Sequence, residues 1–130
     1  MSERYVLDAV ALIRILDGDA PMSVKDVYDK AREGNAEILI PAIVIAEIIW
    51  ILRKRDEHDL IIEVLDDIKD QENTKIVPFS IKIIDEMVKL KETHELHDEI
   101  IALTAFIYNA DGVCTDDDKL VGIKNLKKIW

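Results

Sequence analysis

The chain has 130 residues, 49% of them hydrophobic, which is enough apolar material for one core, so we expect a single domain over residues 1–130. Its 27 acidic residues outnumber its 17 lysines and arginines, and the resulting net charge of −10 excludes a protein that holds nucleic acid through a generally basic surface. One cysteine and no visible secretory signal lead us to expect a cytoplasmic protein without disulfides.

Short apolar runs alternate along the chain with longer runs of helical composition. The apolar runs predict strands at residues 4–8, 37–40, 74–79 and 112–115, and residues 127–130 are a candidate for a short last strand. The longer runs predict helices at residues 9–16, 21–33, 41–55, 60–71, 81–90 and 100–108. Asp19 or Ser23 is the expected cap of the second helix, and Ser80 that of the fifth. Strands that alternate with helices predict a three-layer α/β/α fold with a mostly parallel central sheet.

Residues 38–52 are apolar on every face of the predicted helix and yet carry one carboxylate, Glu47. The run is shorter than the roughly 20 apolar residues that span a bilayer, and Pro41 and Glu47 interrupt it, so we expect no membrane partner. An ionised carboxylate is costly to bury without partners. Glu47 therefore either lines a cleft where a cation meets it, or is protonated or salt-bridged in the core.

Acidic residues stand at comparable places in the α/β pattern. Asp8 ends the first strand, Glu47 lies in the helix after the second, Asp98 starts a helix, and the run from Asp116 to Asp118 follows the fourth strand. Because ligands of parallel sheets bind at the carboxyl ends of the strands, we expect these acids to meet at one edge. Crowded carboxylates favour a hard divalent cation such as Mg²⁺ or Mn²⁺, which can activate water for attack on a phosphodiester.

Each acid also has a purely structural interpretation, which the sequence leaves open. Asp8 and Asp98 can cap the helices that follow them, and residues 116–118 can form a solvated turn. Two rival sites fit poorly. His94 and His97 are one residue closer together than the histidines of the zinc-protease signature, and a phosphoacceptor receiver domain needs paired acids after its first strand.

Several basic residues are candidates for a phosphate-binding rim. They are Arg53, Lys54, Arg55, Lys119, Lys124, Lys127 and Lys128. The first three also suit the C-terminus of a helix, whose dipole favours cations, so a structural interpretation stays open for them. We expect Trp50 and Trp130 to lie in the core or in a dimer contact rather than to stack on bases.

Four segments resemble the signature blocks of the PIN domain family. They are Tyr-Val-Leu-Asp-Ala-Val-Ala-Leu-Ile at residues 5–13, Ile-Pro-Ala-Ile-Val-Ile-Ala-Glu at 40–47, His-Asp-Glu-Ile-Ile-Ala-Leu-Thr-Ala at 97–105 and Val-Cys-Thr-Asp-Asp-Asp-Lys-Leu at 113–120. They follow the family's order and together span almost the whole chain. The resemblance implies a Mg²⁺- or Mn²⁺-dependent endoribonuclease, often the toxin of a toxin–antitoxin pair of the VapC type. It therefore also implies an RNA substrate, an antitoxin partner and a homodimer.

The resemblance assigns roles to individual residues as well. It makes Asp8, Glu47, Asp98 and Asp117 the catalytic acids and metal ligands, with Asp116 as an ambiguous neighbour that is also a candidate ligand.

The match departs from the family pattern at Val10, where Ser, Asn or Thr is common, and at Pro41, where Ser is common. Val10 cannot make the side-chain hydrogen bond to a metal-ligating residue that Ser, Asn or Thr could make there, and loss of such a bond lowers metal affinity. The alternative function is a PIN-like scaffold that binds RNA or protein without cleaving it.

Overall fold

The structure, a computed structural model, describes residues 3–130. Strands and helices alternate along this part of the chain, as the sequence predicts. In chain order the elements are β1 (Glu3–Leu7), α1 (Ala9–Asp17), α2 (Met22–Arg32), β2 (Ala36–Pro41), α3 (Ala42–Lys54), α4 (His58–Asp70), β3 (Thr74–Val77), α5 (Ile81–Lys89), α6 (Leu96–Ile107), β4 (Gly112–Cys114), α7 (Asp118–Gly122) and β5 (Lys128–Ile129).

The five strands form one sheet in the order β3-β2-β1-β4-β5, and all of them run parallel. Val6 of β1 is in register with Leu39 of β2 on one side and with Val113 of β4 on the other. After β1 the chain therefore adds β2 and β3 on one side of β1, and it later adds β4 and β5 on the other side of β1. A crevice opens between neighbouring strands where the order reverses in this way, and ligands of such sheets bind there.

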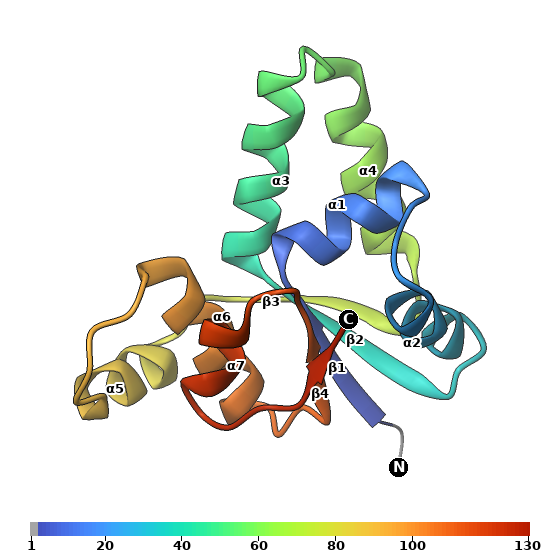
Figure 1. Ribbon diagram of the computed structural model, residues 1–130. Coiled ribbons are helices and arrows are strands. Elements are labelled where there is room, and N and C mark those ends of the chain that lie inside the picture. Colours follow the sequence, from blue (N-terminus) through green and yellow to red (C-terminus); the bar gives the residue numbers. More distant parts are fainter. Residues whose placement is uncertain (1–2) are drawn as a thin grey trace.

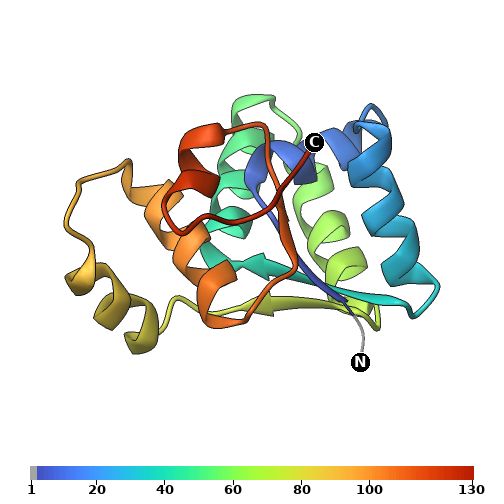
Figure 2. The same cartoon turned by 60° about the horizontal axis from the view of Figure 1, so that its bottom comes forward.

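Helices cover both faces of the sheet, which confirms the predicted three-layer α/β/α fold. In Figure 1, α1, α3 and α4 lie above the strands, and α5, α6 and α7 lie below and to the left. Figure 2 shows the same arrangement after a turn of 60° about the horizontal axis, which brings the bottom of Figure 1 forward. Helices α3 and α4 form an antiparallel pair that rises away from the sheet, and α5 packs on α6 at the opposite side.

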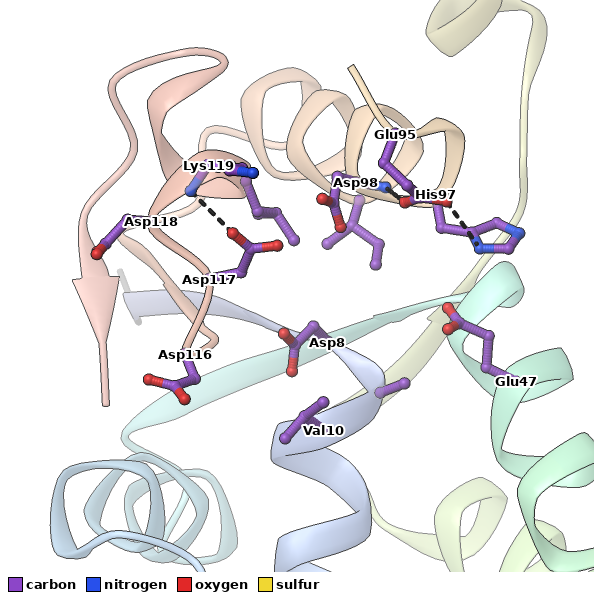
Figure 3. A pocket seen from close by; sticks show the side chains of 13 residues that line it. Asp8, Val10, Glu47, Glu95, His97, Asp98, Asp116, Asp117, Asp118 and Lys119 are labelled. Atoms are coloured by element: carbon purple, nitrogen blue, oxygen red, sulfur yellow. Dashed lines mark hydrogen bonds and ion pairs between the residues drawn. The ribbon is translucent and has the colours of Figure 1, made fainter.

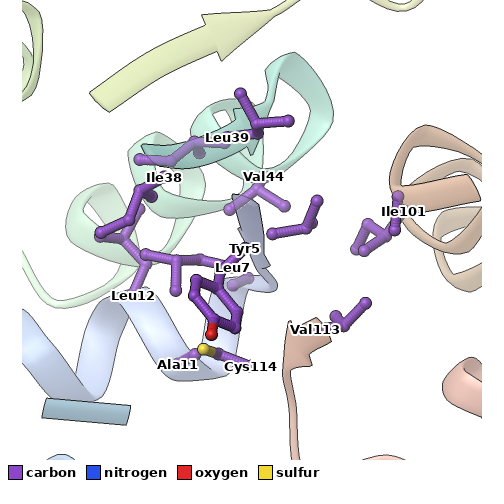
Figure 4. Packing of buried hydrophobic residues seen from close by; sticks show 14 of the residues in the cluster. Tyr5, Leu7, Ala11, Leu12, Ile38, Leu39, Val44, Ile101, Val113 and Cys114 are labelled. Carbon is purple, nitrogen blue, oxygen red and sulfur yellow. The ribbon is translucent and has the colours of Figure 1, made fainter. Parts of the chain in front are cut away.

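The core forms where the central strands meet α1, α3 and α6 (Figure 4). Leu7, Ile38 and Val113 from three strands are at most 1% exposed, as expected of a parallel sheet buried on both faces. A Cβ at Gly112, at the start of β4, would stand 2.6 Å from the Cδ1 atom of Ile129 in β5, so a larger residue there would force the Ile129 side chain to shift. Among residues 3–130, no helix combines the length and apolar character needed to cross a membrane.

Three predicted helix starts need correction. The α2 N-cap is Pro21, without a side-chain hydrogen bond, because the Asp19 carboxylate pairs instead with Arg14 at 3.6 Å. Ser80 occupies the N-cap of α5, but its side chain makes no capping bond. Helix α6 begins at Leu96, two residues before the expected helix start at Asp98, because Glu95 caps it by accepting a 2.9 Å hydrogen bond from the Asp98 N–H.

Candidate active site

A cleft of about 650 Å³ opens at the carboxyl edge of the sheet, beside the ends of β1 and β4 (Figure 3). All five acids predicted for the site line it: Asp8, Glu47, Asp98, Asp116 and Asp117. The other polar residues on its walls are Glu95, His97, Asp118 and Lys119. The topology thus brings together, at the crevice between β1 and β4, acids that lie up to 109 positions apart in the chain (positions 8 and 117).

Asp8 both caps a helix and lines the cleft. Its Oδ1 atom accepts a 2.8 Å hydrogen bond from the Ala11 N–H at the start of α1, so the structural interpretation of this residue is correct. Asp8 is only 7% exposed. Burial raises the pKa of Asp8; hydrogen bonds from Thr115 and the Ala11 N–H oppose the rise, and the nearby charge of Asp117 adds to it. A carboxylate held in this way is fixed in position but costly to ionise.

Glu47 projects from α3 into the cleft, toward His97 (Figure 3). Its Oε1 atom is buried and has no hydrogen-bond partner, and no ion pair of Glu47 occurs within residues 3–130. Burial raises the pKa of Glu47; His97 opposes this rise, whereas Glu95 and Asp8 strengthen it. Of the two sequence interpretations, the cleft wall is therefore the one observed, and the core salt bridge is not.

Asp98 and Asp117 form a hydrogen-bonded acidic pair in the cleft. Asp98 lies in the first turn of α6 and Asp117 caps α7, where its Oδ1 atom accepts a 2.9 Å hydrogen bond from the Lys119 N–H. Burial, the charge of Asp117 and a hydrogen bond with Asp117 raise the pKa of Asp98 to about 6. The Asp117 N–H in turn donates to the Thr115 hydroxyl at 3.1 Å, which orients the loop after β4.

Asp116 and Asp117 differ in their surroundings. Asp116 is exposed, and its carboxylate lies 3.9 Å from the Lys128 ammonium, which also pairs with Asp118 at 3.0 Å. Asp117 is half-buried and faces Asp98. The geometry therefore favours Asp117 over Asp116 as the fourth acid of the cleft.

Glu95 is a site residue that the sequence interpretation missed. One of its oxygens accepts the Asp98 N–H at 2.9 Å, and the other lies 3.3 Å from the His97 Nδ1 atom. Hydrogen bonds from the Asp98 and His97 N–H groups lower the pKa of Glu95 although burial alone would raise it. Glu95 stands three residues before Asp98, which is the spacing between an N-cap residue and the N3 residue of a helix. This spacing is the sequence pattern that could have identified Glu95 as the cap.

His94 and His97 do not face a common site. The His94 Nδ1 atom is 3.2 Å from Glu99, whereas His97 faces Glu95 and Glu47. The helix starts only at Leu96, so the two histidines do not share a helical face, and the zinc interpretation has no geometric support.

The predicted basic rim divides into paired and free cations. Arg55 makes two hydrogen bonds to Asp17, at 3.0 and 3.1 Å, and therefore has a structural role. Arg53 and Lys54 make no ion pair within residues 3–130, and Lys119 lies on the cleft wall.

Trp130 packs against the core with the Arg14 guanidinium 5.7 Å from its ring, as expected of a core residue. Trp50 is 55% exposed, because α3 turns Ile48 and Leu52 toward the core and leaves position 50 outside. The expected core position is therefore wrong for Trp50, whereas a dimer contact stays a prediction.

The donors in the cleft suit a hard divalent cation. They are carboxylate oxygens, the ligands that Mg²⁺ and Mn²⁺ prefer. The pKa values of Asp8, Glu47 and Asp98 are all raised by burial, with like charges adding to the effect, so a cation would relieve an existing cost. Within residues 3–130, however, no three Asp, Glu, His or Cys side chains form a group already poised around an ion.

The PIN domain family model matches residues 5–126 of the chain. Among solved structures, the chain is similar to VapBC2 from Rickettsia felis bound to a DNA fragment from its promoter, with 23% identity, 96% of each chain covered and a TM-score of 0.76. It is also similar to FitAcB from Neisseria gonorrhoeae, with 16% identity, 95% of each chain covered and a TM-score of 0.73. DNA-bound VapBC from Salmonella typhimurium matches at 14% identity over 98% of this chain and 97% of that one, with a TM-score of 0.68. A search of curated proteins found no match.

Proposed function

We propose, since the chain belongs to the PIN domain family of nucleases, that it is a Mg²⁺- or Mn²⁺-dependent endoribonuclease whose nuclease domain spans residues 1–130. The observation that carries the proposal is the convergence of Asp8, Glu47, Asp98 and Asp117 in one cleft at the reversal of strand order. These four acids are the proposed metal ligands and catalytic residues, and Asp116 is the less favoured alternative to Asp117.

The residues of the cleft have different roles in the proposed phosphodiester hydrolysis. The four carboxylates would hold a divalent cation, which would supply a water of lowered pKa and neutralise charge on the phosphate. The Glu95 carboxylate orients Asp98 by accepting its N–H, and the Thr115 hydroxyl orients Asp117 in the same way. Lys119 on the cleft wall is suited to hold a phosphate oxygen of the substrate.

The similarity to the VapBC2 and FitAcB structures supports a role as the toxin of a VapC-type toxin–antitoxin pair, active in the cytoplasm and inhibited by an antitoxin protein. A homodimer is supported by the surface of α5. Ile81, Ile84 and Val88 are exposed at intervals of three and four residues, which is the spacing of a helix–helix seam.

A cleavage assay on purified protein, free of any inhibitor, tests the function. We expect a pool of folded RNAs to be cleaved with Mg²⁺ or Mn²⁺ and to stay intact with EDTA. Asp8→Asn should lower the rate by at least about a hundredfold while the fold survives, because Asn can still cap α1. Asp66→Asn, an exposed site on α4 with the same change of charge, is the matched control.

The catalytically silent scaffold predicts a different result, namely association with RNA or protein and no cleavage under either ion. Undiminished cleavage in Asp8→Asn would place the activity elsewhere and contradict the proposed mechanism.

A further inference from the structure

Trp50 and Lys54 lie next to each other on the outer surface of α3. The Lys54 ammonium is 4.4 Å from the centroid of the indole ring, within the range of a cation–π contact. Trp50 is 55% exposed, and Lys54 makes no ion pair within residues 3–130. The pair therefore presents an open aromatic surface beside a free positive charge.

This pair continues the wall of the acidic cleft. Trp50 and Lys54 follow Glu47 at intervals of three and seven residues, so all three lie on neighbouring parts of the same helical surface. At a rise of 1.5 Å per residue, they lie about 4.5 Å and about 10 Å further along the helix than Glu47. Because α3 rises away from the sheet, this surface leads outward from the cleft (Figure 1).

We infer that Trp50 and Lys54 form a subsite for a nucleotide of single-stranded RNA, whose base stacks on the indole while its phosphate binds the ammonium. The choice of RNA rests on the proposed ribonuclease function. When the nucleotide binds, its base displaces the Lys54 ammonium from the face of the Trp50 indole. The lysine side chain is long enough for the ammonium to reach the phosphate of the same nucleotide. Stacking on an aromatic ring beside a cation is a common way in which proteins hold unpaired strands.

The distribution of charge supports a nucleic acid at this surface rather than a protein contact. The acids of the cleft repel phosphates, so an RNA strand needs positive charge just outside it. Lys119 supplies such a charge on the opposite wall (Figure 3), and Lys54 supplies it beyond Glu47. The neighbouring Arg55 is already bound to Asp17 and cannot serve without breaking that pair.

Binding of a short, unstructured oligoribonucleotide, labelled at one end and followed by fluorescence anisotropy in EDTA, tests the subsite without cleavage. A second probe has the same backbone but lacks bases. Trp50→Ala should weaken binding of the first probe about tenfold and leave binding of the second unchanged, because only stacking is lost. Trp50→Phe should restore part of the affinity.

Lys54→Ala should weaken binding of both probes and lower the salt dependence of binding by about 0.7 in the slope of log K against log salt, as expected for one lost phosphate contact on a single strand. Lys54→Arg should keep that slope. Ile62→Ala and Lys82→Ala are the matched controls, because Ile62 is 71% exposed on α4 and Lys82 is exposed on α5.

The outcomes separate this inference from the proposed function. If the parent protein binds the RNA probe with the predicted pattern but cleaves nothing, the subsite stands and the ribonuclease proposal fails. If the parent cleaves RNA but Trp50→Ala binds the RNA probe as tightly as the parent, the subsite is wrong and the ribonuclease proposal stands. If Trp50→Ala changes the oligomeric mass and not RNA affinity, the surface is a contact between copies and the subsite is also wrong.

Discussion

Asp98 and Asp117 face each other across the cleft from the first turn of α6 and the cap of α7. Burial and the charge of Asp117, together with their shared hydrogen bond, raise the pKa of Asp98 from 3.8 to about 6. A carboxyl with such a pKa is partly protonated near neutral pH. The folded state of the metal-free protein is least stable when Asp98 and Asp117 are both ionised, because their charges repel. Because of this pair, we expect the stability of the protein to depend both on pH and on a bound metal ion.

The free energy of unfolding of metal-free protein should fall as the pH rises through the range from about 4 to about 6. The sign follows because the folded state binds the Asp98 proton more tightly than the unfolded chain, so this stabilisation is complete below pH 3.8 and is lost as the pH passes the folded pKa. Asp98→Asn should remove this contribution and make the metal-free protein more stable at pH 7, by on the order of 1 kcal/mol after screening by solvent. Denaturant unfolding at several pH values measures the difference. An unchanged pH profile in Asp98→Asn would show that Asp98 and Asp117 do not repel each other.

Mg²⁺ or Mn²⁺ should raise the melting temperature of the protein at pH 7. The folded state offers the carboxylate cleft and the unfolded chain does not, so a concentration about 100 times the dissociation constant stabilises by about 2.7 kcal/mol. Asp98→Asn should abolish most of this rise, whereas Asp66→Asn, on the surface of α4, should keep it. Thermal unfolding with and without the ion measures the effect. An equal rise in Asp98→Asn and in the parent protein would place the bound ion outside the cleft.

Loss of the Glu95 side chain should destabilise the protein and disturb the cleft together. Glu95→Ala removes the N-cap of α6, which costs about 1 kcal/mol, and releases the Asp98 N–H and His97. Glu95→Asp, which keeps a capping carboxylate, should retain most of the stability. Unfolding measurements on the two variants, with metal titrations followed by melting temperature, test both effects. Wild-type stability in Glu95→Ala would mean that water replaces the cap at no cost.

Cys114 should not react with alkylating reagents in the folded protein. It is fully buried in β4, and burial, with the charge of Asp8, raises the pKa of its thiol to about 12, so almost no thiolate forms near neutral pH. Denaturation should make the same thiol react at the rate of an exposed cysteine. Mass spectrometry after timed alkylation, with and without denaturant, measures both rates. Rapid labelling of the native protein would require local opening of β4.

Several features of the fold follow from local patterns in the chain. The apolar runs of β1, β2 and β4 became the three central strands, because a run without polar interruption fits a sheet that is covered on both faces. Helix α3 begins after Pro41 and ends at Lys54 with basic residues in its last turn, as its sequence predicts. Helix starts were less predictable, since Ser80 stands at the cap of α5 without a side-chain hydrogen bond and α6 is capped by Glu95, to which the sequence interpretation gave no role.

The sequence by itself determined which residue types reach the carboxyl edge of the sheet, because the end of a parallel strand and the turn that follows it share that edge. It did not determine what surrounds each of them. Asp8 could be a cap or a cleft residue and is both, whereas Trp50 could be buried and is exposed. Only the tertiary structure decided that Asp98 faces Asp117 and that Asp116 turns toward Lys128, because desolvation and charge pairing depend on segments that meet in space and not on neighbours in the chain.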